Sequence, residues 1–225
     1  MRTRAEQATT VEERTSGRAD HALRRFGALT PRILVIGAST GGPQALVALL
    51  TRLAPTLSNI PVVVVLHMPA NFTDVVVDQI ARATGMPTHA PTNGERLMPG
   101  CIYIAPGGAH LKALRLGDVH ILAFSDTAPE NFCKPSVDVL FRSAADSFGP
   151  GVLGLVLTGM GVDGLAGARR IVDAGGSVAV QDEATSAVWG MPGAIAREGL
   201  ASAIAPIERL ADIVADRLGG TRRGS

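Results

Sequence analysis

Ser39 has the surroundings of a catalytic nucleophile. It lies in the glycine-rich segment 37–42, between an apolar run at 33–36 and a helix-like run at 43–50. Glycines permit a sharp turn and leave room for a substrate, and the first N–H groups of a helix can stabilise an anion. The same segment also fits a phosphate-binding loop or a structural turn with Ser39 as a helix cap, so three alternatives are open at this point.

A histidine and an aspartate could complete a triad with Ser39. His67 follows the apolar run 61–66, and Asp163 lies shortly after the run 152–157. The carboxyl ends of parallel strands meet at one edge of a sheet, so these distant residues can lie together. Ser39 would then attack a carbonyl, His67 would take and return the proton, and Asp163 would orient the imidazole. Taken singly, His67 could be a satisfied strand-end histidine and Asp163 a helix N-cap.

The segments that must position these residues alternate between strand and helix. Continuous apolar runs predict buried parallel strands at 32–36, 61–66, 101–105, 152–157 and 177–181. Helix-like segments follow at 43–53, 73–83, 136–147, 164–174 and 207–218. The runs 111–116 and 119–124 flank a Gly-Asp pair and predict a β-hairpin. We expect an α/β, doubly wound, mostly parallel sheet with helices on both faces and an antiparallel β-hairpin.

Length, net charge and the distribution of apolar residues argue against several classes of protein. A chain of 225 residues suits one domain, and a net charge of +1 argues against a general nucleic-acid binder. The N-terminus lacks the apolar segment of a signal peptide, and no apolar run is long enough to cross a bilayer, so we expect a cytoplasmic protein without membrane insertion. Residues 1–30 are predicted to be a disordered tail or linker, with a short helix around 22–26 as the alternative, and residues 219–225 a frayed tail.

Two cysteines, Cys101 and Cys133, are expected to be free thiols. Cys133 has no histidine close to it in the sequence and Cys101 begins a predicted buried strand, so neither is a good nucleophile candidate. No cluster of cysteines and histidines has metal-ligand spacing, and no dinucleotide or ATP motif occurs. We therefore expect neither a cofactor nor a metal.

Several motifs resemble the catalytic domain of the chemotaxis protein-glutamate methylesterases (CheB type). The resemblance covers about residues 31–218 in register, which we take as the catalytic domain. The motifs occur in the family's order and are too long and too many to match by chance. They lie at 36–43, 67–69, 99–106, 135–141, 157–164, 181–186 and 190–192.

The resemblance implies hydrolysis of γ-glutamyl methyl esters on the cytoplasmic helices of methyl-accepting chemotaxis receptors. Many family members also deamidate receptor glutamines. It implies Ser39 as the nucleophile, His67 as general base and then acid, and Asp163 as the orienting carboxylate. The backbone N–H groups of Thr40 and Met160 are matched to the oxyanion hole.

Departures from the family pattern leave an alternative open. The family usually joins this domain to an N-terminal receiver domain, for which residues 1–30 are too short. We therefore expect a stand-alone enzyme or the C-terminal part of a longer chain, with a separate response regulator as a further partner. Leu66 precedes His67 where glutamine is expected, and Lys134 stands where arginine is common. The alternative is a catalytically altered module that binds receptors or another partner.

Overall fold

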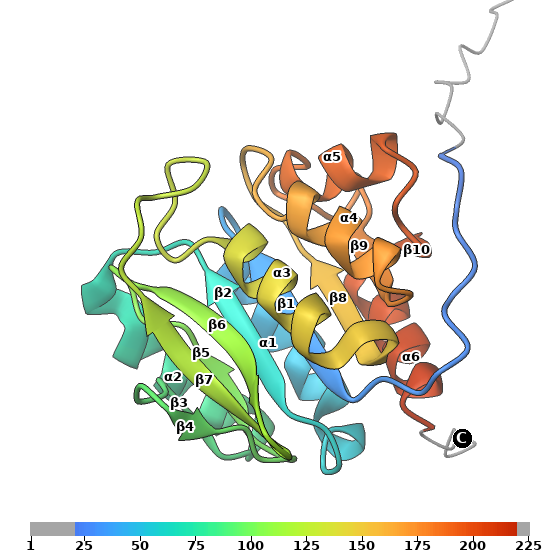
Figure 1. Cartoon of the computed structure of the whole chain (residues 1–225). Helices are drawn as coiled ribbons and strands as arrows, with labels where there is room; N and C mark the ends of the chain where they lie inside the picture. The colour runs from blue at the N-terminus through green and yellow to red at the C-terminus, as the bar shows by residue number, and fades with distance from the viewer. Residues whose placement is uncertain (1–20, 220–225) are drawn as a thin grey trace, which may run out of the picture.

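The computed structural model describes residues 21–219. The predicted tails therefore fall largely outside the described residues. The described part of the first tail, 21–30, forms no helix, so the alternative helix around 22–26 does not form. This segment lies along the domain, with Arg24 N donating to Ala201 O at 2.9 Å and Gly27 N donating to Ser177 Oγ at 2.8 Å (Figure 1).

A seven-stranded parallel sheet forms the centre of the domain, in the order β10-β9-β8-β1-β2-β5-β3. Its strands are β1 (Ile33–Ala38), β2 (Val62–Leu66), β3 (Thr88–His89), β5 (Ile102–Ile104), β8 (Val152–Val156), β9 (Ser177–Gln181) and β10 (Ala203–Ala205). All five predicted strands are confirmed. The short strands β3 and β10 were not predicted.

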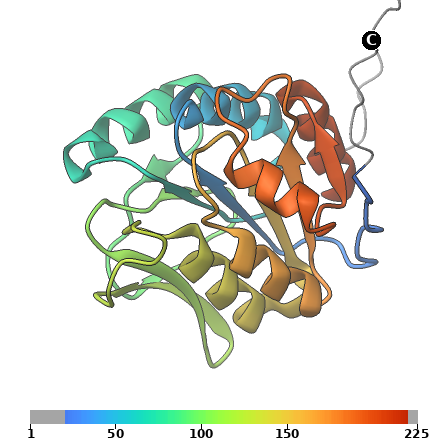
Figure 2. The same ribbon diagram turned by 90° about the horizontal axis from the view of Figure 1, so that it is seen from above.

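Helices cover both faces of the sheet, as predicted (Figure 2). One face carries α1 (Gly42–Leu53), α2 (Thr73–Thr84) and α6 (Ile207–Arg217); the other carries α3 (Val137–Phe148), α4 (Leu165–Asp173) and α5 (Met191–Arg197). Three short 3-10 helices are η1 (Ala54–Thr56), η2 (Ala70–Phe72) and η3 (Gly149–Gly151). In β1, Leu34 and Ile36 face the α1 side while Ile33 and Val35 face the α3 side. Because both faces are buried, the strand is apolar throughout.

The predicted hairpin is confirmed as part of a second, antiparallel sheet. It consists of β6 (His110–Leu116) and β7 (Val119–Ser125), and the short β4 (Glu95–Arg96) pairs with β7. The hairpin buries Leu111, Ala113 and Leu122 in the same core as α3. Ala113 N also donates to Ser143 Oγ of α3 at 3.0 Å. The hairpin thereby buttresses α3, whose first turn contributes to the site described below.

The strand order defines where a site can form. From β1 the chain moves outward to β2 on one side, and it later returns to place β8 on the other side. Crevices in open α/β sheets form at such a switch point, outside the carboxyl ends of the strands. The ends of β2, β1 and β8 are therefore neighbours here. Among residues 21–219, no helix is long and apolar enough to cross a membrane.

Candidate active site

Ser39 lies in the tight connection between β1 and α1, one residue after the strand ends. Its N–H donates to Thr158 O at 3.0 Å, and its carbonyl accepts from Gly42 N at 2.7 Å. Thr158 Oγ1 in turn donates to Thr40 O at 2.9 Å. Gly41 has φ 78°, which a residue with a side chain adopts only under strain. The loop is thus fixed to the end of β8 by hydrogen bonds on both sides of Ser39.

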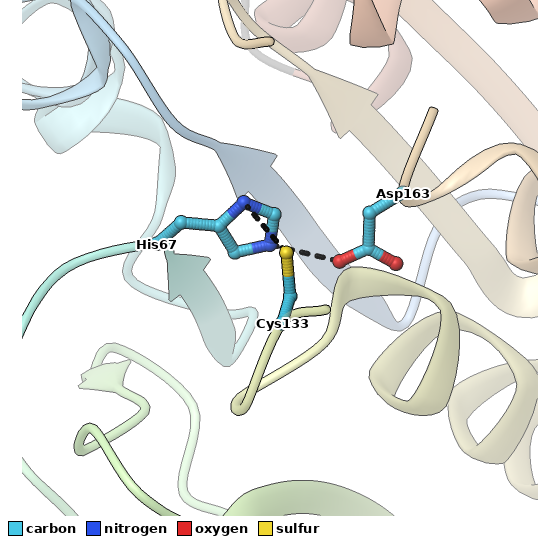
Figure 3. Close-up of side chains that lie close together, drawn as sticks. All are labelled: His67, Cys133 and Asp163. Atoms are coloured by element: carbon cyan, nitrogen blue, oxygen red, sulfur yellow. Dashed lines mark hydrogen bonds and ion pairs between the residues drawn. The ribbon is translucent and has the colours of Figure 1, made fainter. Parts of the chain in front are cut away.

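His67 follows β2 and lies on the strand end adjoining Ser39. Ala38 pairs with Leu66 in the sheet, and His67 N donates to Ala38 O at 3.0 Å. Its side chain reaches across β1 to Asp163, which follows β8: Nε2 and Asp163 Oδ2 are 2.8 Å apart (Figure 3). The fold therefore brings His67 and Asp163 into contact although they are 96 residues apart. Among the described residues, the hydroxyl of Ser39 makes no hydrogen bond, and catalytic contacts are often long before substrate binds.

Asp163 is only 2% exposed and accepts hydrogen bonds on both carboxylate oxygens. Oδ2 accepts from His67 and from Val137 N at 2.7 Å. Oδ1 accepts from four donors: Ser136 Oγ at 2.8 Å, Asp138 N and Gly164 N at 3.1 Å, and Asn131 Nδ2 at 3.3 Å. The N–H groups of Val137 and Asp138 belong to the first turn of α3, where the helix dipole favours a negative charge.

These donors keep Asp163 ionised. Burial alone would raise the pKa of this carboxyl, but hydrogen bonds from His67, Ser136 and the first N–H groups of α3 lower it from 3.8 to about 2. An ionised carboxylate can only accept, so His67 Nε2 must carry the hydrogen of the 2.8 Å bond. The other ring nitrogen, Nδ1, is therefore the one that can accept a proton. In chymotrypsin-like triads the carboxylate binds Nδ1 of the histidine, whereas here Asp163 binds Nε2.

Cys133 is a neighbour of His67 that the sequence analysis did not identify. Its Sγ lies 3.5 Å from His67 Nδ1 and 3.3 Å from Asn131 O (Figure 3). The two residues are 66 positions apart, so spacing along the chain gave no signal. Burial, followed by the charges of Asp163 and Asp138, raises the pKa of the Cys133 thiol to about 11. The thiol is protonated at neutral pH, which is unlike the activated cysteine of a thiol hydrolase.

The sequence analysis assigned no role to Asn131, nor to Asp138, which lies in the family motif at 135–141. Asn131 Nδ2 donates to Asp138 Oδ2 at 2.9 Å and to Asp163 Oδ1, so one amide bridges two carboxylates. Asp138 is 3% exposed, and burial raises its pKa despite the hydrogen bond from Gly167 N. Asn131 adopts φ 50° and Phe132 φ 62°, an uncommon backbone for residues with side chains. Positive φ at non-glycine residues is the kind of strain that collects at functional sites.

Thr40 and Met160 lie on the two loops that meet at Ser39. In the region 21–219, neither backbone N–H donates a hydrogen bond to the protein. The N–H of Ser39 itself is already used by Thr158 O. The Met160 loop approaches closely because Gly159 has no side chain: a Cβ there would lie 2.8 Å from Ser39 Cβ. Met160 is 73% exposed. The two free N–H groups are therefore on accessible loops beside the serine.

Taken together, the fold and the site define an α/β domain whose switch point holds a serine loop, an imidazole and a buried ionised carboxylate. That class of site suits hydrolysis by way of a side-chain nucleophile. The order along the chain, with the carboxylate last, separates it from the α/β-hydrolases, in which the acid precedes the histidine.

The chain belongs to the CheB methylesterase family, whose model matches residues 34–214. It is 46% identical over 199 residues to a protein-glutamate methylesterase/protein-glutamine glutaminase of Rhodopseudomonas palustris, covering 88% of this chain and 51% of that one. A Bradyrhizobium diazoefficiens protein of the same name is 48% identical, covering 83% of this chain and 47% of that one. The chain thus spans about half the length of the curated relatives it matches.

A solved structure confirms the relationship at the level of the fold. The crystal structure of the Thermotoga maritima CheB methylesterase catalytic domain matches with a TM-score of 0.80 and 32% sequence identity. The match covers 84% of this chain and 99% of that domain. The expected α/β fold and the expected family are both confirmed.

Proposed function

We propose that residues 31–218 are a protein-glutamate methylesterase domain that hydrolyses γ-glutamyl methyl esters on chemoreceptor helices. Protein-glutamine glutaminase activity is the second proposed activity, since the named relatives carry both. The observation that carries the proposal is the 2.8 Å bond between His67 Nε2 and the buried, ionised Asp163. That bond leaves Nδ1, which lies 3.5 Å from Cys133 Sγ, as the ring nitrogen that can take a proton beside the strand end that bears Ser39.

In the proposed reaction, Ser39 Oγ attacks the ester carbonyl carbon while His67 Nδ1 takes the hydroxyl proton. The tetrahedral oxyanion is stabilised by the backbone N–H groups of Thr40 and Met160, which donate no other bond among the described residues. His67 then protonates the methoxide oxygen, and methanol leaves an acyl-enzyme on Ser39. A water molecule, deprotonated by His67, then attacks the acyl carbon, and His67 returns the proton to Ser39 Oγ as the bond to glutamate breaks. A glutamine side chain would follow the same course with ammonia as the leaving group.

Large apolar side chains near the site suit a protein substrate. Phe132 is fully exposed, Met160 is 73% exposed and Val162 is 50% exposed. All three lie within three residues of Asn131 or Asp163, which are joined by a hydrogen bond. Exposed apolar side chains beside a site can contact the apolar face of an amphipathic receptor helix. We propose receptor cytoplasmic helices as the substrate, a response regulator as the regulatory partner, and the cytoplasm as the location.

The test is methanol release from methylated receptor membranes by wild-type protein and by Ser39→Ala. Ser58→Ala is the matched control, because Ser58 is an exposed serine outside the site. We expect Ser39→Ala to lose at least about a thousandfold in rate, since a serine nucleophile has no substitute, and Ser58→Ala to keep the wild-type rate. Unchanged release by Ser39→Ala would refute the proposal. Receptor binding without methanol release, and without labelling of Ser39 by a fluorophosphonate, would favour a binding module instead.

A further inference from the structure

His67, Cys133 and Asp163 form a compact set of possible metal ligands. One ligand atom from each lies within 4.8 Å of the other two (Figure 3). His67 contacts both partners through different ring nitrogens: Nε2 lies 2.8 Å from Asp163 Oδ2, and Nδ1 lies 3.5 Å from Cys133 Sγ. The three side chains come from separate segments: the end of β2, the loop before α3 and the loop after β8. From this juxtaposition we propose that the cluster is a zinc site, and that zinc bound there inhibits the enzyme.

The donor set selects the type of ion. A neutral imidazole nitrogen, a thiolate sulfur and a carboxylate oxygen are the three ligand types of zinc sites, whereas magnesium and calcium take oxygen ligands. Tetrahedral zinc with bonds of about 2.0–2.3 Å holds its ligand atoms about 3.3–3.6 Å apart. The sulfur–nitrogen separation of 3.5 Å already falls in that range. Asp163 Oδ2 is hydrogen-bonded to the other ring nitrogen, so the imidazole or the carboxylate must turn before all three side chains can bind one ion. The fourth position is left to water.

The charges around the cluster favour a cation. Asp163 is ionised, and Asp138 lies close enough to act on the Cys133 thiol. The negative charges of Asp163 and Asp138 disfavour a thiolate at Cys133 when no cation is present. The same charges attract a divalent ion, which can replace the thiol proton. Two basic side chains of the loop before α3 and of α3 are already paired: Lys134 with Asp126 at 2.6 Å and Arg142 with Glu130 at 2.7 Å.

Access and anchoring are both present. The side chain of His67 is 14% exposed and Cys133 is partly exposed, so an ion can enter from solvent. Asp163 Oδ1 keeps its four donors when Oδ2 turns to a metal, which would hold that ligand in place. Zinc here would occupy the base of the proposed reaction. The inhibition therefore rests on the proposed function, whereas metal binding does not.

The experiment titrates cobalt(II) into the metal-free full chain and follows thiolate-to-cobalt charge-transfer absorption. The variants are Cys133→Ser and, as the matched control, Cys101→Ser, because Cys101 is the second free and partly buried thiol. Zinc affinity is measured by displacement of the cobalt. We expect one cobalt per chain with a thiolate band in the wild type and in Cys101→Ser. Cys133→Ser should lack the band and bind zinc at least about tenfold more weakly.

A second arm measures hydrolysis with added zinc and then with excess chelator, each rate normalised to that variant's own metal-free rate. Reversible inhibition of the wild type and of Cys101→Ser, with a weaker effect on Cys133→Ser, is the expected result. Absence of a thiolate band in the wild type, or equal zinc affinity of Cys133→Ser and wild type, would overturn the site. If the wild-type protein shows the thiolate-to-cobalt band but releases no methanol from receptors, the metal site is supported and the proposed function is rejected.

Discussion

Replacing Asp163 with asparagine removes the charge at the centre of the site while keeping its shape. The carboxylate of Asp163 is the acceptor in all six of its hydrogen bonds. An amide must turn its NH2 toward one set of those donors. If the NH2 faces His67, the imidazole must accept at Nε2 and carry its proton on Nδ1, so the base of the proposed reaction is lost. A wrong tautomer of this kind costs about 10⁴ in kcat in a serine protease.

The expected loss of stability follows from the pKa of Asp163. A shift from 3.8 to about 2 corresponds to about 2 kcal/mol in favour of the folded state. Because the folded-state pKa lies below the unfolded value, this stabilisation is complete above about pH 5. It decreases as the pH falls through 3.8, is about half gone at pH 3, and disappears below about 2. The asparagine side chain of the Asp163→Asn variant cannot titrate. The difference in free energy of unfolding between the wild type and this variant should therefore narrow over the same pH range.

Urea unfolding at pH 7, 5, 4 and 3 measures that gap. We expect a difference of about 2–4 kcal/mol at pH 7, where the variant also leaves donors unpaired. Asp146→Asn is the matched control, since Asp146 is exposed and pairs with Arg170 at the surface; it should change stability by less than about 1 kcal/mol. A gap that stays constant from pH 7 to pH 3 would refute the assignment of Asp163 as an ionised, strongly bonded carboxylate.

Two further predictions concern the loop before α3. Asn131→Ala should lose about 1–3 kcal/mol, because the bridge between Asp138 and Asp163 is removed, while Asn131→Gly should recover about 1 kcal/mol of that loss by relieving φ 50°. Equal stability of the two variants in urea unfolding would contradict the strain argument. In a Cys101→Ser background, alkylation of Cys133 should accelerate about tenfold per pH unit from pH 8 to 10, because its pKa is about 11. A rate that levels off near pH 8.5 would show an ordinary thiol.

Strand and helix patterns were readable from the sequence where local composition determines the outcome. β1 and β8 are apolar throughout because both faces of the sheet are covered, and the Gly-Asp pair at 117–118 allowed the hairpin to be predicted. β5, which is as short as β10, was predicted because it lies within the apolar run 101–105, whereas β3, β4 and β10 were not predicted, because two or three residues carry no period. Their pairing depends on the neighbouring strands and loops.

For the candidate site, too, some features follow from the sequence and others only from the tertiary structure. The sequence by itself determined which residue types follow the strands at Ser39, His67 and Asp163, and parallel strands were enough to expect them at one edge. Only the tertiary structure decided that the ionised Asp163 holds His67 through Nε2, because that depends on where the first turn of α3 points its N–H groups. It alone also brought Cys133 against the imidazole, since a contact across 66 residues depends on how the loop before α3 folds.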